Sequence, residues 1–238
     1  MSENTKKQLY DALVVAHGDL PPKACLKALS KASRRLIALD GAADRLIAIG
    51  LWPHIILGDL DSISASALKS TPRHGVKIVQ IKEQQTSDLE KGLQFCKEQN
   101  WKHIAVTGFL GHRLDHSLNA FGVLSRFRDL EITLITSQSI ARVLHGRVTF
   151  KCAMQPGQQI SLMPLPVARG VTLIGVKWPL RNQTLRQTGF VSLSNEATQT
   201  AVTMRQTSGC GLFIVQRRRG QIELESVVKP RQELAKGT

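Results

Sequence analysis

The sequence is poor in several features that mark common classes of protein. Aromatic residues make up only 5% of the 238 residues, and no stacking motif is interleaved with the basic residues. The longest strongly apolar stretch, residues 46–58, contains Pro53 and His54 and is too short to span a bilayer. The apolar run ALVVA near the N-terminus is too short for the core of a signal peptide. We therefore expect a cytoplasmic protein with no membrane span.

Cysteine is also scarce, and the motifs of several enzyme classes are missing. The four cysteines are far apart and form no CxxC pair or Cys/His cluster, which favours buried thiols over a disulfide framework or a zinc site. His112 and His116 are four residues apart but have no suitable third ligand nearby. No GxxxxGK(S/T), GxGxxG or HExxH motif is present, so a P-loop kinase, a classical dinucleotide fold and a zinc hydrolase lose support.

Acidic residues are unevenly distributed along the chain. All nine aspartates precede residue 130, and from residue 146 onward 13 Lys and Arg accompany only 4 Glu. The formal net charge of +14 fits a protein that binds nucleic acid, a membrane surface or small polyanions. Any chemistry that needs clustered carboxylates is therefore expected in the first part of the chain.

The hydrophobic pattern predicts two domains. Short apolar runs such as RLIALD, HIILGD and HIAVTG alternate with helix-like segments, which is typical of a doubly wound, mostly parallel α/β sheet whose ligands bind at the carboxyl ends of the strands. From about residue 147 the runs are β-leaning and separated by Gly, Pro, Asn and Ser, which predicts a smaller all-β sandwich. We place the α/β domain at residues 1–145, the β-sandwich at 146–224 and a polar C-terminal tail at 225–238.

Four aspartates fall where this pattern places strand ends. Asp40 and Asp59 each close an apolar run, Asp61 follows two residues after Asp59, and Asp88 begins a predicted helix. In extended backbone, side chains at i and i+2 point the same way, so Asp59 and Asp61 could share a cation, with Gly58 allowing a close backbone approach. Dense carboxylates favour Mg²⁺ bound together with substrate phosphates. A turn or cap is the commoner role of any one such aspartate, but four at one edge favour a cation site.

Basic residues accompany these carboxylates. Lys91 lies one helical turn after Asp88 and could either pair with it or reach a phosphate. The segment TGFLGHRLDH follows an apolar run and opens a predicted helix, whose N-terminus could receive an anion. Within it, Arg113 could bind a phosphate through two hydrogen bonds, and Asp115 lies two residues later.

The motifs resemble those of the thiamine pyrophosphokinase family and occur in the same order. The resemblance spans roughly residues 10–216 and rests on six short motifs: LDGAADRL, GDLDSI, QQTSDLEK, GHRLDHSLNAF, GVKWPL and SLSNE. It implies an α/β catalytic domain joined to a β-sandwich domain. It also implies a homodimer that places thiamine between the catalytic domain of one subunit and the β-domain of the other.

The resemblance further implies roles for individual residues. Asp59, Asp61 and Asp88 would hold Mg²⁺ and ATP, with Asp40 close by. The phosphate-side residues would be Gln84, Lys91 and Arg113, and the acceptor side would carry Asp115. Asp40 and Ser87 would be further substrate-binding residues, and thiamine contacts would come from Trp178, Ser194 and Asn195. Family members often read Asp-Gln-Asp-x-Thr-Asp where this chain reads EQQTSD, so Gln85 lacks a carboxylate and Ser87 keeps a hydroxyl.

The implied reaction is transfer of the diphosphoryl group of ATP to the alcohol of thiamine, giving thiamine diphosphate and AMP. An acceptor such as a hydroxymethyl-pterin is an alternative, because a related diphosphokinase family resembles the same α/β domain; the second domain favours thiamine. A nucleic-acid-binding protein is the other alternative, suggested by the net charge and by QRRR at residues 216–219. The scarcity of aromatic residues argues against it.

Overall fold

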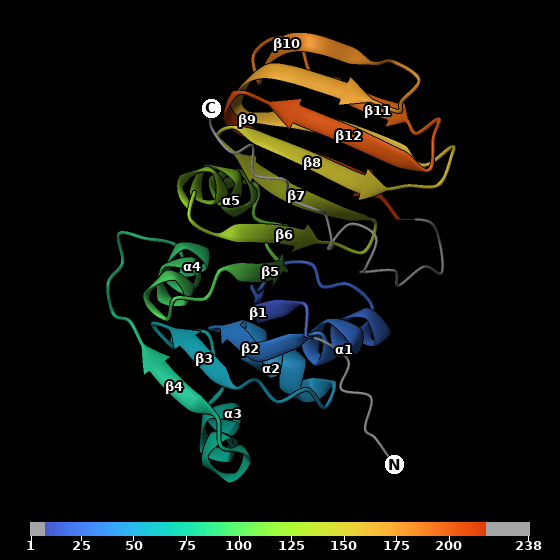
Figure 1. Ribbon diagram of the computed structural model, residues 1–238. Helices are drawn as coiled ribbons and strands as arrows, with labels where there is room; N and C mark the ends of the chain where they lie inside the picture. Colours follow the sequence, from blue (N-terminus) through green and yellow to red (C-terminus); the bar gives the residue numbers. More distant parts are fainter. Residues whose placement is uncertain (1–7, 218–238) are drawn as a thin grey trace. The chain divides into compact units, whose positions relative to one another are not determined.

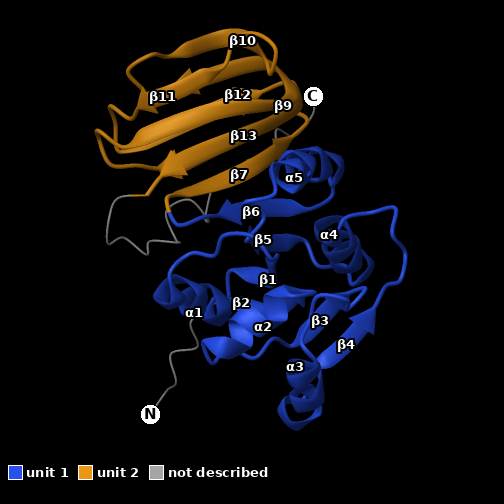
Figure 2. Ribbon diagram, turned by 180° about the vertical axis from the view of Figure 1, so that it is seen from behind, with its two compact units in different colours: residues 1–137 blue, residues 138–238 orange. Residues whose placement is uncertain are grey.

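A computed structural model describes residues 8–217, which form two compact units that divide after residue 137 (Figures 1 and 2). The proposed tail at 225–238 and the last two residues of the QRRR motif lie outside the described residues. Within residues 8–217, no helix is long and apolar enough to cross a membrane.

The first unit is an α/β unit built on a parallel sheet of order β4-β3-β2-β1-β5-β6. The strand order reverses between β1 and β5, so the sheet is doubly wound, as the sequence predicts. Its strands are β1 (Tyr10–Val15), β2 (Ser33–Leu39), β3 (Ile55–Gly58), β4 (Lys77–Gln80), β5 (His103–Thr107) and β6 (Glu131–Ile135). Its helices are α1 (Lys23–Lys31), α2 (Ala42–Ala48), α3 (Ala65–Ser70), α4 (Asp88–Glu98) and α5 (Leu114–Arg126), with a short 3₁₀ turn at Thr71–His74.

Apolar strands and amphipathic helices account for the core of this unit. Strand residues such as Leu13, Ile37 and Ile104 are fully buried, because a parallel sheet is covered on both faces. In α4, Leu89, Leu93 and Cys96 are buried at the predicted helical spacing, and the hydroxyl of Ser87 accepts a hydrogen bond from a backbone N–H of the first turn. The helix is therefore capped at the residue just before Asp88.

The second unit is all β within residues 138–217. Its strands pair in the order β7-β13-β9-β12-β8, and β10 and β11 also pair with β9. Their bounds are β7 (Ser139–His145), β8 (Val148–Ala153), β9 (Gln159–Ile174), β10 (Leu180–Arg186), β11 (Ser192–Glu196), β12 (Ala201–Gln206) and β13 (Ser208–Gln216). Phe150 and Phe213 are fully buried with ring centroids 5.0 Å apart. The predicted β-sandwich domain is confirmed.

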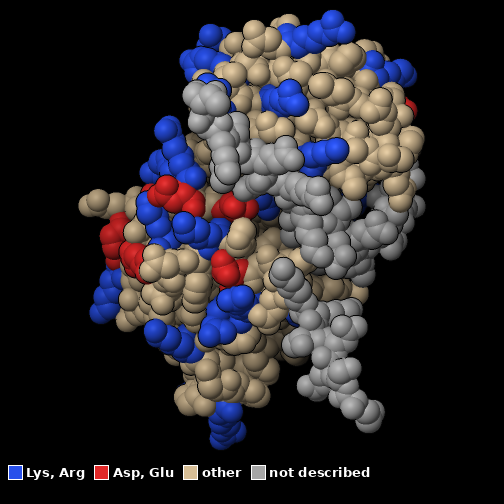
Figure 3. Space-filling view, in the orientation of Figure 1, with Lys and Arg blue, Asp and Glu red and all other residues tan. Residues whose placement is uncertain are grey.

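Strand β7 lies in the second unit, although the sequence analysis placed the first domain at residues 1–145. It pairs with β13 from Ser139 to His145, so it belongs to the antiparallel sheet. The four cysteines are buried thiols, as the sequence predicts. Figure 3 shows acidic side chains gathered on the first unit, whereas the visible face of the second unit is mainly basic among its charged residues.

Candidate active site

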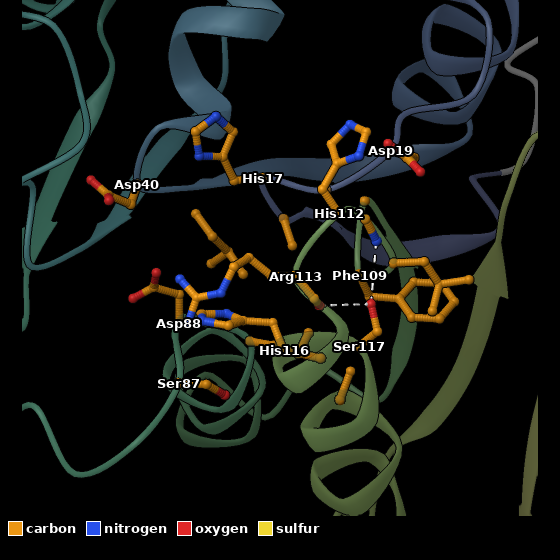
Figure 4. Close-up of a pocket in the computed structure, with 18 of the residues that line it drawn as sticks. His17, Asp19, Asp40, Ser87, Asp88, Phe109, His112, Arg113, His116 and Ser117 are labelled. Atoms are coloured by element: carbon orange, nitrogen blue, oxygen red, sulfur yellow. Dashed lines mark hydrogen bonds between the residues drawn. The ribbon is translucent and has the colours of Figure 1, made fainter.

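The pocket of the first unit lies where the strand order reverses. It has a cavity volume of about 630 Å³ and is formed by the loops after β1, β2 and β5 and by the start of α4. This is the edge at which doubly wound sheets bind ligands. Figure 4 shows Asp40 and Asp88 toward one end of the pocket and Asp19 and Phe109 toward the other. Its polar lining comprises His17, Asp19, Asp40, Arg45, Ser62, Ser87, Asp88, His112, Arg113, His116 and Ser117.

Two glycines let the loops after β1 and β5 pack closely. The backbone N–H of Gly18 donates to the carbonyl of Gly108 over 2.7 Å. A Cβ on Gly18 would lie 2.0 Å from the carbonyl oxygen of Leu110, and one on Gly108, where φ is +70°, would lie 2.2 Å from that of Ala16. Side chains at either position would separate the loops, so glycine is required for this wall of the pocket.

Three carboxylates converge beside the pocket. One oxygen each of Asp40, Asp59 and Asp61 lies within 4.8 Å of the others. The close approach depends on Gly58, since a Cβ there would lie 3.0 Å from the Cβ of Asp40. The i, i+2 spacing of Asp59 and Asp61 predicts that they converge on extended backbone. Instead β3 ends at Gly58 and Leu60 has a φ of +70°, so a turn brings the carboxylates together.

Burial raises the pKa values of Asp40 and of the neighbouring Asp88. Burial is the main cause of the raised pKa of Asp40, and the charges of Asp61 and Asp59 add to it, while hydrogen bonds from Ser62 oppose it. Burial also raises the pKa of Asp88, assisted by Asp40 and Asp59 and opposed by Lys91. The contributions from neighbouring carboxylates reflect mutual repulsion, which a bound cation would relieve.

The predicted phosphate-side residues at the start of α4 lie near these acids. Lys91 is buried, and its Nζ lies 3.6 Å from a carboxylate oxygen of Asp88, so the pairing left open by the sequence is present. The side-chain amide of Gln84 donates to Asp59 over 3.4 Å. Ser87 lines the pocket and caps α4, whereas Gln84 and Lys91 do not line it.

Arg113 and Asp115 form an exposed ion pair at the start of α5. The guanidinium donates to both carboxylate oxygens, over 2.9 and 2.6 Å, and this pairing lowers the pKa of Asp115. Exposed pairs contribute little to stability, so Arg113 can exchange this partner for another anion at small cost. Arg113 lines the pocket, and Asp115 does not.

Two of the residues proposed for thiamine in the second unit, Trp178 and Asn195, are hydrogen-bonded to each other. Asn195 is buried; its side chain accepts from the backbone N–H of Trp178 over 3.1 Å and donates to the Trp178 carbonyl over 2.7 Å. The Trp178 side chain is 55% exposed, and the Nζ of Lys177 lies 4.9 Å from its ring centroid. Ser194 has a φ of +52°, and its N–H donates to the hydroxyl of Ser161. Asn195 therefore fixes the backbone that presents Trp178.

Sequence reasoning missed part of the pocket. Asp40 was expected at the acidic edge, whereas His17 and Arg45, which also line the cavity, were not expected. The position of His17 directly after β1, beside the reversal of strand order, could have indicated it. Nothing in the sequence indicated Arg45, because its contacts join α2 to a loop 27 residues earlier in the chain.

Comparisons with known proteins cover both units. Residues 26–136 match the family model "Thiamin pyrophosphokinase, catalytic domain", and residues 147–210 match "Thiamin pyrophosphokinase, vitamin B1 binding domain". Thiamin pyrophosphokinase 1 of Caenorhabditis elegans is 29% identical over 187 residues, which are 72% of this chain and 75% of that protein. Thiamine pyrophosphokinase 2 of Arabidopsis thaliana is 27% identical over 223 residues, 83% of each protein.

A solved structure shares the fold. The crystal structure of thiamine pyrophosphokinase from Bacillus subtilis superposes with a TM-score of 0.74 at 22% identity, covering 86% of this chain and 98% of that one.

Proposed function

The chain belongs to the thiamine pyrophosphokinase family, and we propose that it transfers the diphosphoryl group of ATP to the hydroxyl of thiamine with the help of Mg²⁺. The products are thiamine diphosphate and AMP. The observation that carries the proposal is the convergence of three carboxylates at the ligand-binding edge of the sheet, inside the span of the catalytic family model.

The donor chemistry of the acidic site fits Mg²⁺. Asp40, Asp59 and Asp61 offer hard carboxylate oxygens close together, and Asp88 adds a carboxylate whose pKa is raised mainly by burial and further by Asp40 and Asp59. We propose that Asp59, Asp61 and Asp88 hold the ion, with Asp40 as a further candidate ligand. When bound, the ion would neutralise charge on the phosphate oxygens of ATP.

Cationic and polar side chains would position the phosphates. Phosphoryl transfer depends mainly on alignment and on stabilisation of developing negative charge. Lys91 and Arg113 would supply positive charge, with Arg113 exchanging the carboxylate of Asp115 for phosphate oxygens. Gln84 and Ser87 would add hydrogen bonds on the same side, and the released Asp115 would face the acceptor alcohol.

The second unit would supply the thiamine contacts. Thiamine carries a positively charged thiazolium ring, which an exposed indole face such as that of Trp178 can bind by a cation–π interaction. Ser194 and Asn195 would contribute by fixing the local backbone or by contacting thiamine directly. The second unit has few acidic groups, and its positive charge would repel the thiazolium ring. That charge would therefore serve ATP and product rather than thiamine.

We further propose a homodimer with shared active sites, as the family resemblance implies. Large apolar side chains exposed in this single chain support an interface: Leu114 and Leu118 on α5, and Trp178, Phe190 and Leu193 in the second unit. Mixing an Asp61→Asn subunit with a Trp178→Ala subunit tests the arrangement. Shared sites predict that mixed dimers regain a fully intact site and activity, whereas sites confined to one subunit predict no recovery.

A cytoplasmic location is proposed on the cysteine chemistry, since all four cysteines are buried in the thiol form. We propose no role in nucleic-acid binding.

A side-by-side acceptor assay tests the function. Purified protein is incubated with ATP and Mg²⁺, together with thiamine, with a hydroxymethyl-pterin, or with no acceptor. We expect diphosphorylated product with thiamine and only background with the pterin. Preference for the pterin, or AMP formation indifferent to thiamine, would contradict the proposal.

A further inference from the structure

We infer that Asp44 and Arg45, adjacent residues of α2, are positioning residues that each fasten one of the two loops bordering the candidate active site. The inference rests on the proposed function for what these loops do. Neither residue has a role in the proposal above. Helix α2 begins two residues after Asp40. One short helix therefore carries both residues and adjoins the acidic site.

Asp44 fastens the segment that follows the acidic turn. One carboxylate oxygen accepts the backbone N–H of Ser64 over 2.9 Å, and the other accepts the Ser64 hydroxyl. Ser64 also caps α3, because its hydroxyl accepts the N–H of Ala67. Asp44 therefore holds the point where the acidic turn joins the next helix.

The link from Ser64 back to the acidic site is short. Ser62, two residues earlier, donates through its hydroxyl to Asp61 over 2.8 Å, and its N–H lies 3.4 Å from a carboxylate oxygen of Asp40. Ile63, between the two serines, is buried. Releasing Ser64 would loosen the segment that orients the carboxylate of Asp61 relative to that of Asp40.

Arg45 fastens the loop after β1. Its Nη1 donates to the backbone carbonyl of His17 over 3.1 Å and to that of Gly18. The N–H of Gly18 donates in turn to the carbonyl of Gly108, so the loop is held between α2 and the loop after β5. Releasing the Arg45 contacts would loosen the pocket wall but leave the acidic turn in place.

The two residues should therefore affect different properties. Residues that orient metal ligands from outside typically change metal affinity by about 10- to 100-fold when replaced. We expect Asp44→Ala to raise the Mg²⁺ concentration for half-maximal activity by about tenfold, and Asp44→Asn, which keeps one acceptor oxygen, to raise it less. We expect Arg45→Ala to raise the KM for ATP several-fold with a smaller change in kcat. Arg45→Lys, which keeps a cationic donor, should raise the KM for ATP less.

Hydrogen exchange of the metal-free and nucleotide-free protein supplies a readout independent of activity. Asp44→Ala should speed amide exchange at residues 62–67 only, and Arg45→Ala at residues 16–19 only. Because no ligand is present, a direct contact between Arg45 and ATP cannot produce this pattern. Asp129→Ala and Arg73→Ala serve as matched controls on the surface and should change neither exchange nor kinetics.

The outcomes separate this inference from the proposed function. If the wild type makes no thiamine diphosphate but the two exchange patterns appear, the function is wrong and the fastening contacts stand. If the wild type is active and the variants lose only thermal stability, with unchanged exchange in both loops, the inference is overturned. If the alanine variants do not fold, the same measurements are made on Asp44→Asn and Arg45→Lys. Unchanged dependence of activity on Mg²⁺ and on ATP in both variants would then refute the inference.

Discussion

Replacing Asp61 by Asn should abolish turnover while stabilising the metal-free protein. The substitution removes one of three negative charges whose oxygens lie within 4.8 Å of one another. It therefore removes two repulsions, one with Asp40 and one with Asp59. Asn keeps an oxygen that can accept the hydrogen bond from the Ser62 hydroxyl, so little native bonding is lost.

The magnitude follows from the separation of the charges. At about 4.8 Å each repulsion amounts to about 0.9 kcal/mol at the dielectric constant of water, and more where the medium is less polar. Asp61 is exposed, so the lower figure applies, and dissolved salt screens both repulsions further. We expect the free energy of unfolding to rise by about 1 kcal/mol, which corresponds to a Tm increase of about 2–4 °C for a chain of this size.

Thermal unfolding with and without Mg²⁺ provides the assay. Mg²⁺ should raise the Tm of the wild type and have a smaller effect on Asp61→Asn, since a ligand stabilises only the state that binds it. Asp129→Asn, which alters an exposed ion pair with Lys97, is the matched control and should respond to Mg²⁺ as the wild type does. A metal-free Asp61→Asn protein that is less stable than the wild type, yet active, would refute the reasoning.

The remaining predictions concern pH and the second unit. The pKa values of Asp40 and Asp88 are raised in the folded state. As pH rises above the usual pKa of 3.8, these two groups therefore hold more protons in the folded metal-free protein than in the unfolded chain. Their contribution makes the free energy of unfolding fall as pH rises from 3.8 through the raised pKa values. Urea unfolding at several pH values should show this slope reduced in Asp88→Asn, and an identical slope would contradict it. Trp178→Ala should raise the KM for thiamine and leave that for ATP unchanged, as steady-state kinetics can determine; equal changes in both would argue against a thiamine contact. Asn195→Ala should lower the free energy of unfolding by about 1–3 kcal/mol, measured by urea unfolding, because the buried Asn195 side chain loses two hydrogen bonds to the part-buried backbone of Trp178. An unchanged value would show that water replaces the side chain.

The general architecture could be predicted because it depends on local pattern. Short apolar runs ended by Gly or Asp indicated the parallel strands, and the helical spacing of Leu89, Leu93 and Cys96 indicated α4. Carboxylates at the ends of neighbouring parallel strands must meet at one edge, so the convergence of Asp40 and Asp59 followed from the topology. Strand β7 was harder to assign, since its apolar sequence fits either unit and only its pairing with β13 decides.

The details that failed depend on contacts between distant residues or on backbone dihedral angles. The positive φ of Leu60 turns the chain between Asp59 and Asp61, and leucine gives no sequence signal for that conformation. The contacts of Arg45 with His17 and Gly18, and of Asn195 with Trp178, link residues 17 or more positions apart. Their partners become visible only once the fold brings them together.

The most direct test of the central claim is to follow the phosphorus-containing products of a single turnover by ³¹P nuclear magnetic resonance. With thiamine, ATP and Mg²⁺, transfer of the diphosphoryl group predicts AMP and thiamine diphosphate in equal amounts, both abolished in Asp61→Asn. Formation of ADP and a thiamine monophosphate, or AMP released without thiamine, would contradict the account.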